Sequence, residues 1–232
     1  MDRREFVAAS GVAAGAAALG NAAPTDAQAS PDRVSPLANE YVTVWESPDA
    51  QRVFAYTPGI CRLPSGRLVV SMDRGGPGAA ELPGVKRDGE IYRGLILTSD
   101  DHGQTWTQRA ETPMLHARPF VAGGSVYVLG HSGDLRIVRS DDDGESWSEM
   151  AKLTDSKSWH QSACNVHHAN GKIYLVMEHN INTDPELRGW LVSKLAPVLM
   201  SAPVDADLTQ RDSWTFASEM SFDDAVERHG KP

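Results

Sequence analysis

Several polar residues of this 232-residue chain flank short apolar runs, and their types suit acid–base chemistry on an acidic ligand. An aspartate can act as a general acid, and an arginine can hold a carboxylate through two parallel hydrogen bonds. Asp73 and Asp88, at the start and near the end of the long loop after the first apolar hairpin, are the candidate acids. Each candidate could instead be a solvated loop charge or part of a structural ion pair. The residues expected to bind substrate are Arg74, Arg118, His160 and Glu178, with His116 nearby.

Histidines near the third apolar hairpin raise the question of a metal site. They are His160, His167, His168 and His179. Structural zinc sites usually combine closely spaced pairs with cysteine, whereas neighbouring residues of a strand point to opposite sides. We therefore expect solvated histidines, no metal and no cofactor. The sequence also has no glycine-rich phosphate loop and no Gly-x-Ser-x-Gly nucleophile motif.

Two segments that read almost alike indicate which elements position these residues. Residues 99–106 and 140–147 both fit Ser-x-Asp-x-Gly-x-Thr/Ser-Trp, and Ser99 and Ser140 lie 41 positions apart. This spacing is close to the roughly 40–50 residues of a four-stranded propeller blade. The glycine supplies a positive φ for a tight turn, the aspartate accepts backbone N–H bonds, and the tryptophan buries apolar area. We expect a repeat protein whose unit is a β-blade.

The aspartate run before Gly144 can also be compared with a calcium loop. In the register of an EF-hand, the first and last ligand positions would fall on Arg139 and Met150. Neither side chain can bind a hard cation, so the sequence favours a hairpin turn.

The repeated motif resembles the Asp box of the sialidase family with BNR repeats, where it closes a hairpin between the outer strands of a blade, far from the active site. Residues 56–68 also resemble the first-blade segment of that family, in which an Arg-Ile-Pro tripeptide supplies the first of three arginines that clamp the sialic acid carboxylate. Pro58 matches the proline, but Tyr56 replaces the arginine and carries no permanent charge. Residues 159–162 and 200–215 resemble a divergent branch of secreted bacterial sialidase-like proteins.

The resemblance implies a secreted exo-α-sialidase-like glycoside hydrolase that acts on terminal sialic acid or another acidic sugar of glycans. In that family an aspartate of a first-blade loop is the acid/base, and later blades supply a tyrosine nucleophile with its glutamate. The resemblance therefore implies that Asp73 is the catalytic acid, with Asp88 as the second choice. We expect this chain alone to be inactive, because those later blades are missing from it. The alternative is a non-catalytic β-propeller that binds glycans or scaffolds a partner.

The predicted fold class is all-β, a sialidase-type six-bladed β-propeller with about three blades in this chain. Apolar hairpins with turns at 64–66, 123–124 and 170–171 mark the blades. The partial propeller is predicted over 51–232, with blades at about 51–112, 113–155 and 158–218, after a linker or edge strand at 30–50. Residues 221–232 read as an interblade loop. Three blades cannot close a ring, so we expect missing C-terminal blades of the same protein as partners.

The first 29 residues read as an export signal of the twin-arginine type. Arg3 and Arg4 precede a short apolar run and an Ala-x-Ala site that ends at Ala29. An N-terminal amphipathic helix is the alternative. We expect an exported protein, periplasmic or extracellular, with no membrane span after the signal.

Net charge limits the class of partner that the protein can bind, and the two cysteines raise the question of a disulfide. A net charge of −9 argues against nucleic acid as a partner, because such binding needs a broad basic surface. Cys61 and Cys164 could pair in an oxidising compartment. In the predicted propeller they lie on strands of non-adjacent blades, which favours two unpaired, buried thiols.

Overall fold

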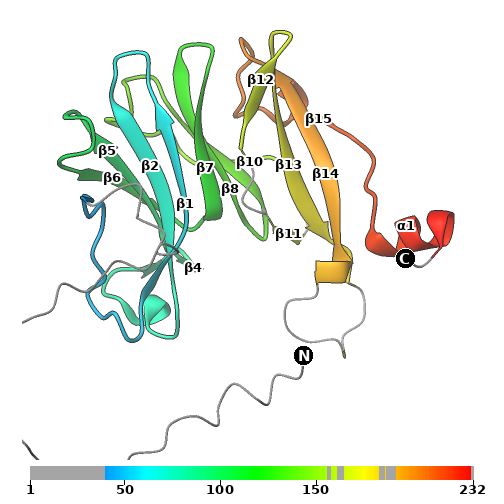
Figure 1. Cartoon of the computed structure of the whole chain (residues 1–232), viewed down its shortest axis with the longest axis horizontal. Coiled ribbons are helices and arrows are strands. Elements are labelled where there is room, and N and C mark those ends of the chain that lie inside the picture. Colours follow the sequence, from blue (N-terminus) through cyan, green and yellow to red (C-terminus); the bar gives the residue numbers. More distant parts are fainter. Residues whose placement is uncertain (1–39, 156–157, 161–164, 183–185, 187–191, 231–232) are drawn as a thin grey trace, which may run out of the picture. The chain divides into compact units, whose positions relative to one another are not determined.

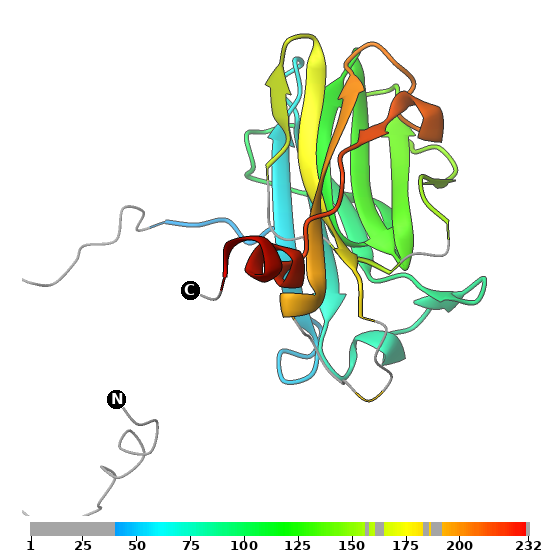
Figure 2. The same cartoon turned by 90° about the vertical axis from the view of Figure 1, so that its right-hand side faces the viewer.

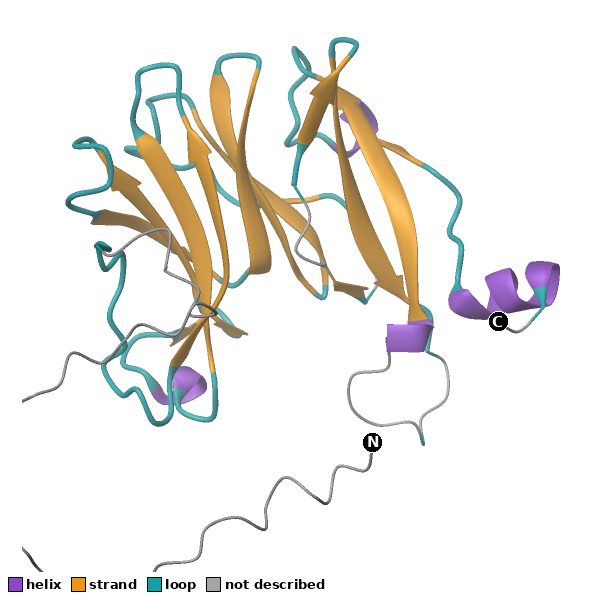
Figure 3. Ribbon diagram, in the orientation of Figure 1, coloured by secondary structure: helices purple, strands orange, loops and turns teal. Residues whose placement is uncertain are grey.

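The computed structural model describes residues 40–155, 158–160, 165–182, 186 and 192–230, and all of its sheets belong to the compact unit Val42–Pro232. Strands dominate this part of the chain (Figure 3). Three antiparallel sheets follow one another along the sequence, and mostly consecutive strands pair within each (Figure 1). This order is typical of propeller blades. The predicted all-β class is confirmed, whereas the six-bladed type and the blade number stay predictions. The expected signal, residues 1–29, lies outside the described residues.

The first sheet has the strand order β1-β2-β5-β6, and the second has β7-β8-β9-β10. The long connection from β2 to β5 holds a short 3₁₀ helix and the small hairpin β3–β4. The bounds are β1 Phe54–Arg62, β2 Leu68–Gly75, η1 Ala79–Glu81, β3 Lys86–Arg87, β4 Glu90–Ile91, β5 Gly94–Ser99, β6 Thr107–Thr112, β7 Leu115–Ala122, β8 Ser125–Ser132, β9 Asp134–Ser140 and β10 Ala151–Lys152.

The third sheet has the order β11-β13-β14-β15, and β12 also pairs with β13. Short helices flank it. The bounds are β11 Trp159–His160, β12 His167–Ala169, β13 Lys172–Asn180, η2 Val192–Lys194, β14 Leu195–Pro203, η3 Arg211–Ser213, β15 Thr215–Phe216 and α1 Phe222–His229.

The apolar core lies between consecutive sheets, and β8 shows how the sequence builds it. Successive side chains of a strand point to opposite faces. Val126 and Val128 therefore pack in a cluster with residues of the first sheet, while Tyr127 and Leu129 pack in a cluster with residues of the third. All four are buried. Fully burying a leucine such as Leu129 stabilises the fold by about 1.5–3 kcal/mol, so both faces of β8 contribute to stability.

Residues 40–50, the described part of the expected linker or edge strand, form no strand. Val44 and Trp45 instead pack with Trp106 against a third apolar cluster of the first sheet. Val44 and Trp45 thus cover the face of a sheet, and the segment does not extend its edge. The buried members of that cluster are Val70, Met72, Leu95 and Leu97.

The two Ser-x-Asp-x-Gly turns have the same internal hydrogen bonds. In the first turn, Oγ of Ser99 accepts the N–H of Gly103 at 2.8 Å, and Asp101 accepts both the N–H and the hydroxyl of Thr105 at 2.8 and 2.6 Å. Ser140, Asp142 and Ser146 repeat these contacts in the second turn. Gly103 and Gly144 have φ of 90° and 84°, a region that favours glycine. The predicted turn chemistry is confirmed.

The chain after the third sheet differs from the expected interblade loop, because α1 forms there. Ser221 caps the helix: its hydroxyl accepts the N–H of Asp224, whose carboxylate in turn accepts the N–H of Ser221. This reciprocal pattern satisfies helix donors that would otherwise lack partners. Figure 2 shows α1 beside η2 at one end of the third sheet. Lys194 and Asp223 join these two elements through an ion pair of 2.8 Å. No helix within the described ranges is both long and apolar enough to cross a bilayer.

Candidate functional site

The inner strand of each sheet, β1, β7 or β11, and the strand that pairs with it bring polar residues to the same end of the sheet. Tyr56 pairs with Asp73 in the first sheet, and His160 pairs with Glu178 in the third. In the second sheet, His131 pairs with Leu115, which directly precedes His116. Each pair combines the start of an inner strand with the end of the next strand. Three hairpins of one design therefore supply one candidate site.

Asp73 connects the first sheet to the second within this site. Its side chain is buried, with 4% of the residue exposed. Oδ1 of Asp73 accepts hydrogen bonds from the hydroxyl of Thr57 and from the backbone N–H of His116, the latter at 3.0 Å. Buried polar groups need such partners, so the carboxylate is held in one orientation.

Two β-bulges shape the strand starts beside Asp73. The register of β1 shifts between Tyr56 and Gly59, and that of β7 shifts between Leu115 and Arg118. Inside these bulges, Thr57 has φ of 44° and His116 has φ of 53°. A positive φ is unfavourable for a β-branched residue such as threonine. Bulges re-aim side chains, and backbone strain of this kind concentrates at functional sites.

Arg118 links this end of the sheets to a pocket. Its Nη1 donates to the carbonyl oxygens of Thr57 at 2.9 Å and of Ala117 at 3.1 Å, and the residue is buried. The pocket has a volume of about 590 Å³ and lies along the inner strands of the sheets. Its lining consists of Pro58, Gly59, Ile60, Cys61, Arg62, Arg118, Pro119, Phe120, Val121, Asn165, Val166 and His168.

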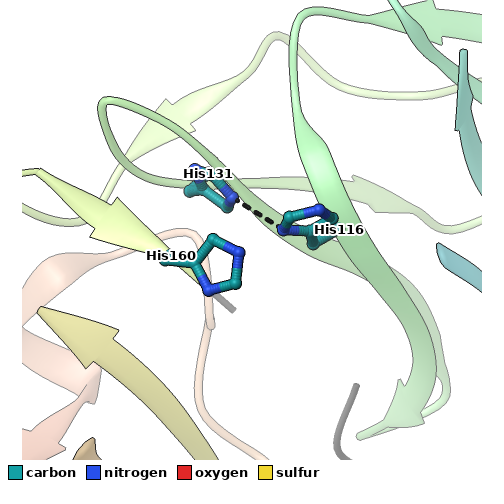
Figure 4. Close-up of side chains that lie close together, drawn as sticks. All are labelled: His116, His131 and His160. Carbon is teal, nitrogen blue, oxygen red and sulfur yellow. Dashed lines mark hydrogen bonds between the residues drawn. The ribbon is translucent and has the colours of Figure 1, made fainter. Parts of the chain in front are cut away.

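Three histidines gather beside Asp73: His116 from β7, His131 from β8 and His160 from β11. Figure 4 shows their rings turned toward one another. Nε2 of His131 and Nδ1 of His116 are 3.2 Å apart, within hydrogen-bond distance. The ring centroid of His160 lies 4.5 Å from that of His116 and 5.5 Å from that of His131. One ring nitrogen from each histidine lies within 4.8 Å of the other two.

Burial favours the neutral form of two of these imidazoles. It lowers the pKa of His131 to about 3, with smaller contributions from the charges of His116 and His160. Burial also lowers the pKa of His116, an effect that Asp73 and Glu178 partly oppose. Neutral imidazole is both a hydrogen-bonding group and the form that binds metals. Glu178 completes the cluster, because its Oε2 lies 2.8 Å from Nδ1 of His160.

The structure thus brings together Asp73, Arg118, His160 and Glu178, four of the residues that the sequence singled out. Arg74 and Asp88 lie elsewhere. Nη2 of Arg74 donates to the carbonyl oxygen of Tyr92 at 2.6 Å and to Glu111 at 2.8 Å, because strand alternation directs it away from Asp73. Asp88 lies exposed in the turn between β3 and β4. Neither position supports the role that we expected from the sequence.

His131 is the site residue that the sequence analysis missed, and the other histidines behave differently from it. His131 lies near the end of β8, as Glu178 lies near the end of β13. An alignment of the three hairpins would therefore have found His131. His167 and His168 are exposed. Nδ1 of His179 lies 2.8 Å from Oε1 of Glu219, outside the cluster.

No protein-family model matches the chain, and no curated protein matches its sequence. Among solved structures, an α-L-arabinanase from Penicillium chrysogenum, complexed with arabinobiose, is 15% identical with a TM-score of 0.48, over 78% of this chain and 53% of the arabinanase. An α-L-arabinofuranosidase from Lactobacillus brevis is 17% identical with a TM-score of 0.49, over 77% and 60%. An exo-β-1,3-galactanase from Clostridium thermocellum is 15% identical with a TM-score of 0.49, over 75% and 37%. The alignments thus span 37–60% of these three enzymes, none of which is a sialidase.

Proposed function

We propose that this chain carries one side of the ligand site of an exported, glycan-acting β-propeller hydrolase whose substrate contains an acidic sugar, sialic acid or a uronate. The observation that supports it best is the buried carboxylate of Asp73, fixed by Thr57 and by the N–H of His116. Glycoside hydrolases act through a pair of carboxylates, one of which is a general acid. Asp73 is our candidate for that acid.

Two further groups fit this proposal. Arg118 lies at the same end of the sheets as Asp73 and lines the pocket, so it could pair with the carboxylate of an acidic sugar. Glu178 is a second carboxylate beside the cluster, positioned by His160. It could stabilise positive charge on the sugar, as the second carboxylate of such enzymes does.

A non-catalytic glycan-binding propeller is the second candidate, and Tyr56 favours it. Tyr56 pairs with Asp73 in the register of β1 and β2 and is 46% exposed. Its ring lies edge-on to that of Phe54, with centroids 6.4 Å apart. Exposed aromatic rings offer apolar area with a polar tip, which suits the surface of a sugar.

Calorimetric titration of the chain with sialyllactose, glucuronic acid and lactose tests the proposal. We expect the two acidic ligands to bind and lactose to bind more weakly. Arg118→Gln should remove the difference, whereas Arg52→Gln, at an exposed ion pair with Glu81, should keep it. Equal binding of acidic and neutral sugars, or no binding, would contradict the acidic substrate.

Hydrolysis of fluorogenic sialosides and glucuronides then separates the two candidates. Turnover that Asp73→Asn abolishes and Asp88→Asn preserves would assign the acid to Asp73. Binding without turnover is expected for this chain alone, because the nucleophile would come from later blades. Binding that Asp73→Asn leaves unchanged, in a protein inactive on all of these substrates, would favour the glycan-binding module.

A further inference from the structure

We propose that His116, His131 and His160 form a binding site for one divalent transition-metal ion, with zinc as the best fit. This inference does not depend on the proposed function. It rests on three imidazole nitrogens, contributed by three strands of two sheets, that all lie within 4.8 Å of one another.

The spacing of the nitrogens suits a tetrahedral ion. Zinc–nitrogen bonds of about 2.0–2.1 Å place two ligand nitrogens about 3.3–3.4 Å apart at tetrahedral angles. Nδ1 of His116 and Nε2 of His131 are already 3.2 Å apart. The ring nitrogen of His160 lies within 4.8 Å of both, so a shift of this ring toward them completes the spacing.

The donor set selects the class of metal. Imidazoles bind zinc, copper, nickel and iron, whereas calcium and magnesium prefer oxygen ligands. Three histidines leave a fourth tetrahedral position for water or a ligand, an arrangement found in catalytic rather than structural zinc sites.

Glu178 supplies the outer contact that metal-bound histidines usually have. Its carboxylate lies 2.8 Å from Nδ1 of His160, and only about one sixth of either side chain is exposed. Such a carboxylate fixes the ring and its tautomer, leaving Nε2 to bind the metal. Asp73 holds the backbone of His116, another of the three ligands, by accepting its N–H. The buried carboxylate of Asp73 and the partly buried carboxylate of Glu178 thus lie beside the imidazoles and would offset the charge of a divalent ion.

The rival explanation is a purely structural cluster, in which one imidazole of His116 and His131 donates its proton to the other. That hydrogen bond fits the 3.2 Å separation equally well. It does not explain why His160 and a carboxylate converge on the same point from the third sheet. A bound metal ion accounts for the positions of His116, His131, His160 and Glu178 together.

Metal titration of the chain, stripped with a chelator, distinguishes the two explanations. We would add Co²⁺ alone and follow its visible absorption, which intensifies in a four-coordinate site, and then displace it with Zn²⁺. The expected result is one Co²⁺ per chain. His229→Ala, an exposed histidine in α1, is the matched control and should bind as the parent does.

Two variants test the assignment in different ways. His131→Ala should lose the intensified absorption. Glu178→Gln keeps all three ligands and should weaken the affinity for Co²⁺ by roughly 10–100-fold. If His131→Ala does not fold, as judged by circular dichroism, Glu178→Gln decides the question. A parent chain without a four-coordinate Co²⁺ spectrum, or a Glu178→Gln variant with unchanged affinity, would overturn the proposal.

Discussion

Oδ1 of Asp73, near the end of β2, accepts a hydrogen bond of 3.0 Å from the backbone N–H of His116, near the start of β7. This bond joins two sheets at the point where both candidate activities are located. The two residues that donate hydrogen bonds to Oδ1 of Asp73, Thr57 and His116, both have positive φ. The position of the histidine cluster therefore depends on the first sheet, although none of its three members belongs to that sheet.

Replacing Asp73 by alanine should destabilise the fold. The N–H of His116 and the hydroxyl of Thr57 would lose their acceptor in a buried site. An unsatisfied buried donor costs about 1–3 kcal/mol, so we expect the free energy of unfolding to fall by about that amount. Asp73→Asn retains one carbonyl oxygen and should lose less. Urea unfolding of the two variants measures the difference, and equal losses would show that these hydrogen bonds do not stabilise the fold.

The two turn aspartates should make the fold sensitive to acid. Hydrogen bonds from the hydroxyls of Thr105 and Ser146, followed by those from their backbone N–H groups, lower the pKa of Asp101 and Asp142 to about 2. An unfolded aspartate has a pKa of about 3.9, so the unfolded state takes up protons first as the pH falls. The stabilisation is present above about pH 4 and is lost toward pH 2.

The measurement is the melting temperature between about pH 5 and pH 2. The double variant Asp101→Asn and Asp142→Asn should show a shallower decline over this range than the parent. Asp88→Asn, at an exposed turn, should follow the parent. A double variant with the parent's decline would assign the acid sensitivity to other carboxylates.

Gly130 should not accept a side chain without movement of β7. A Cβ at this position would lie 2.9 Å from both Cβ of Ala117 and the carbonyl oxygen of Leu115. Overpacking of this kind typically costs about 1–3 kcal/mol, and we expect Gly130→Ala to lose that much stability. Because Leu115 and Ala117 flank His116, the variant should also shift the imidazole resonances of His116 and His131 in an NMR spectrum. Unchanged resonances and stability would show that the strands separate freely.

The thiol of Cys61 should react slowly in the folded protein. Burial raises its pKa to about 12, and the structure records it as a free cysteine. Only the thiolate is nucleophilic, so its fraction at pH 8 is roughly a thousandfold below that of an ordinary cysteine. Labelling with Ellman's reagent in a Cys164→Ser background, before and after denaturation, measures this protection. Cys164 itself lies outside the described residues. Fast labelling of the native variant would contradict the raised pKa of Cys61.

The parts of the fold that the sequence predicted are those set by local chemistry. Gly66, the pair Gly123–Gly124 and the pair Asn170–Gly171 all have positive φ at the tips of the expected hairpins. The serine–aspartate turns formed as expected because the two partners of each hydrogen bond lie no more than four residues apart in the chain. The capped helix α1 was missed, although Ser221 and Asp224 carry a capping pattern.

The site was only partly predictable because its geometry depends on long-range pairing. Asp73 and Glu178 could be chosen because each follows an apolar run. His131, in contrast, lies in a Gly-His-Ser stretch that reads as a loop. The bulge at Thr57 has no local signal either, since threonine disfavours the φ that it adopts there. The register between strands, rather than residue type, decides which side chains meet.

The serine–aspartate turns and the candidate site lie at opposite ends of the strands. In the first sheet, Leu68 of β2 pairs with Ser99 at the first turn, whereas Asp73 pairs with Gly94 at the other end of β5. Substitutions that change ligand preference can therefore accumulate around Asp73 without disturbing the hydrogen bonds that close the blade. The turns that close the blades and the residues of the candidate site lie at different ends of the strands, so selection can change the site while the turns stay the same.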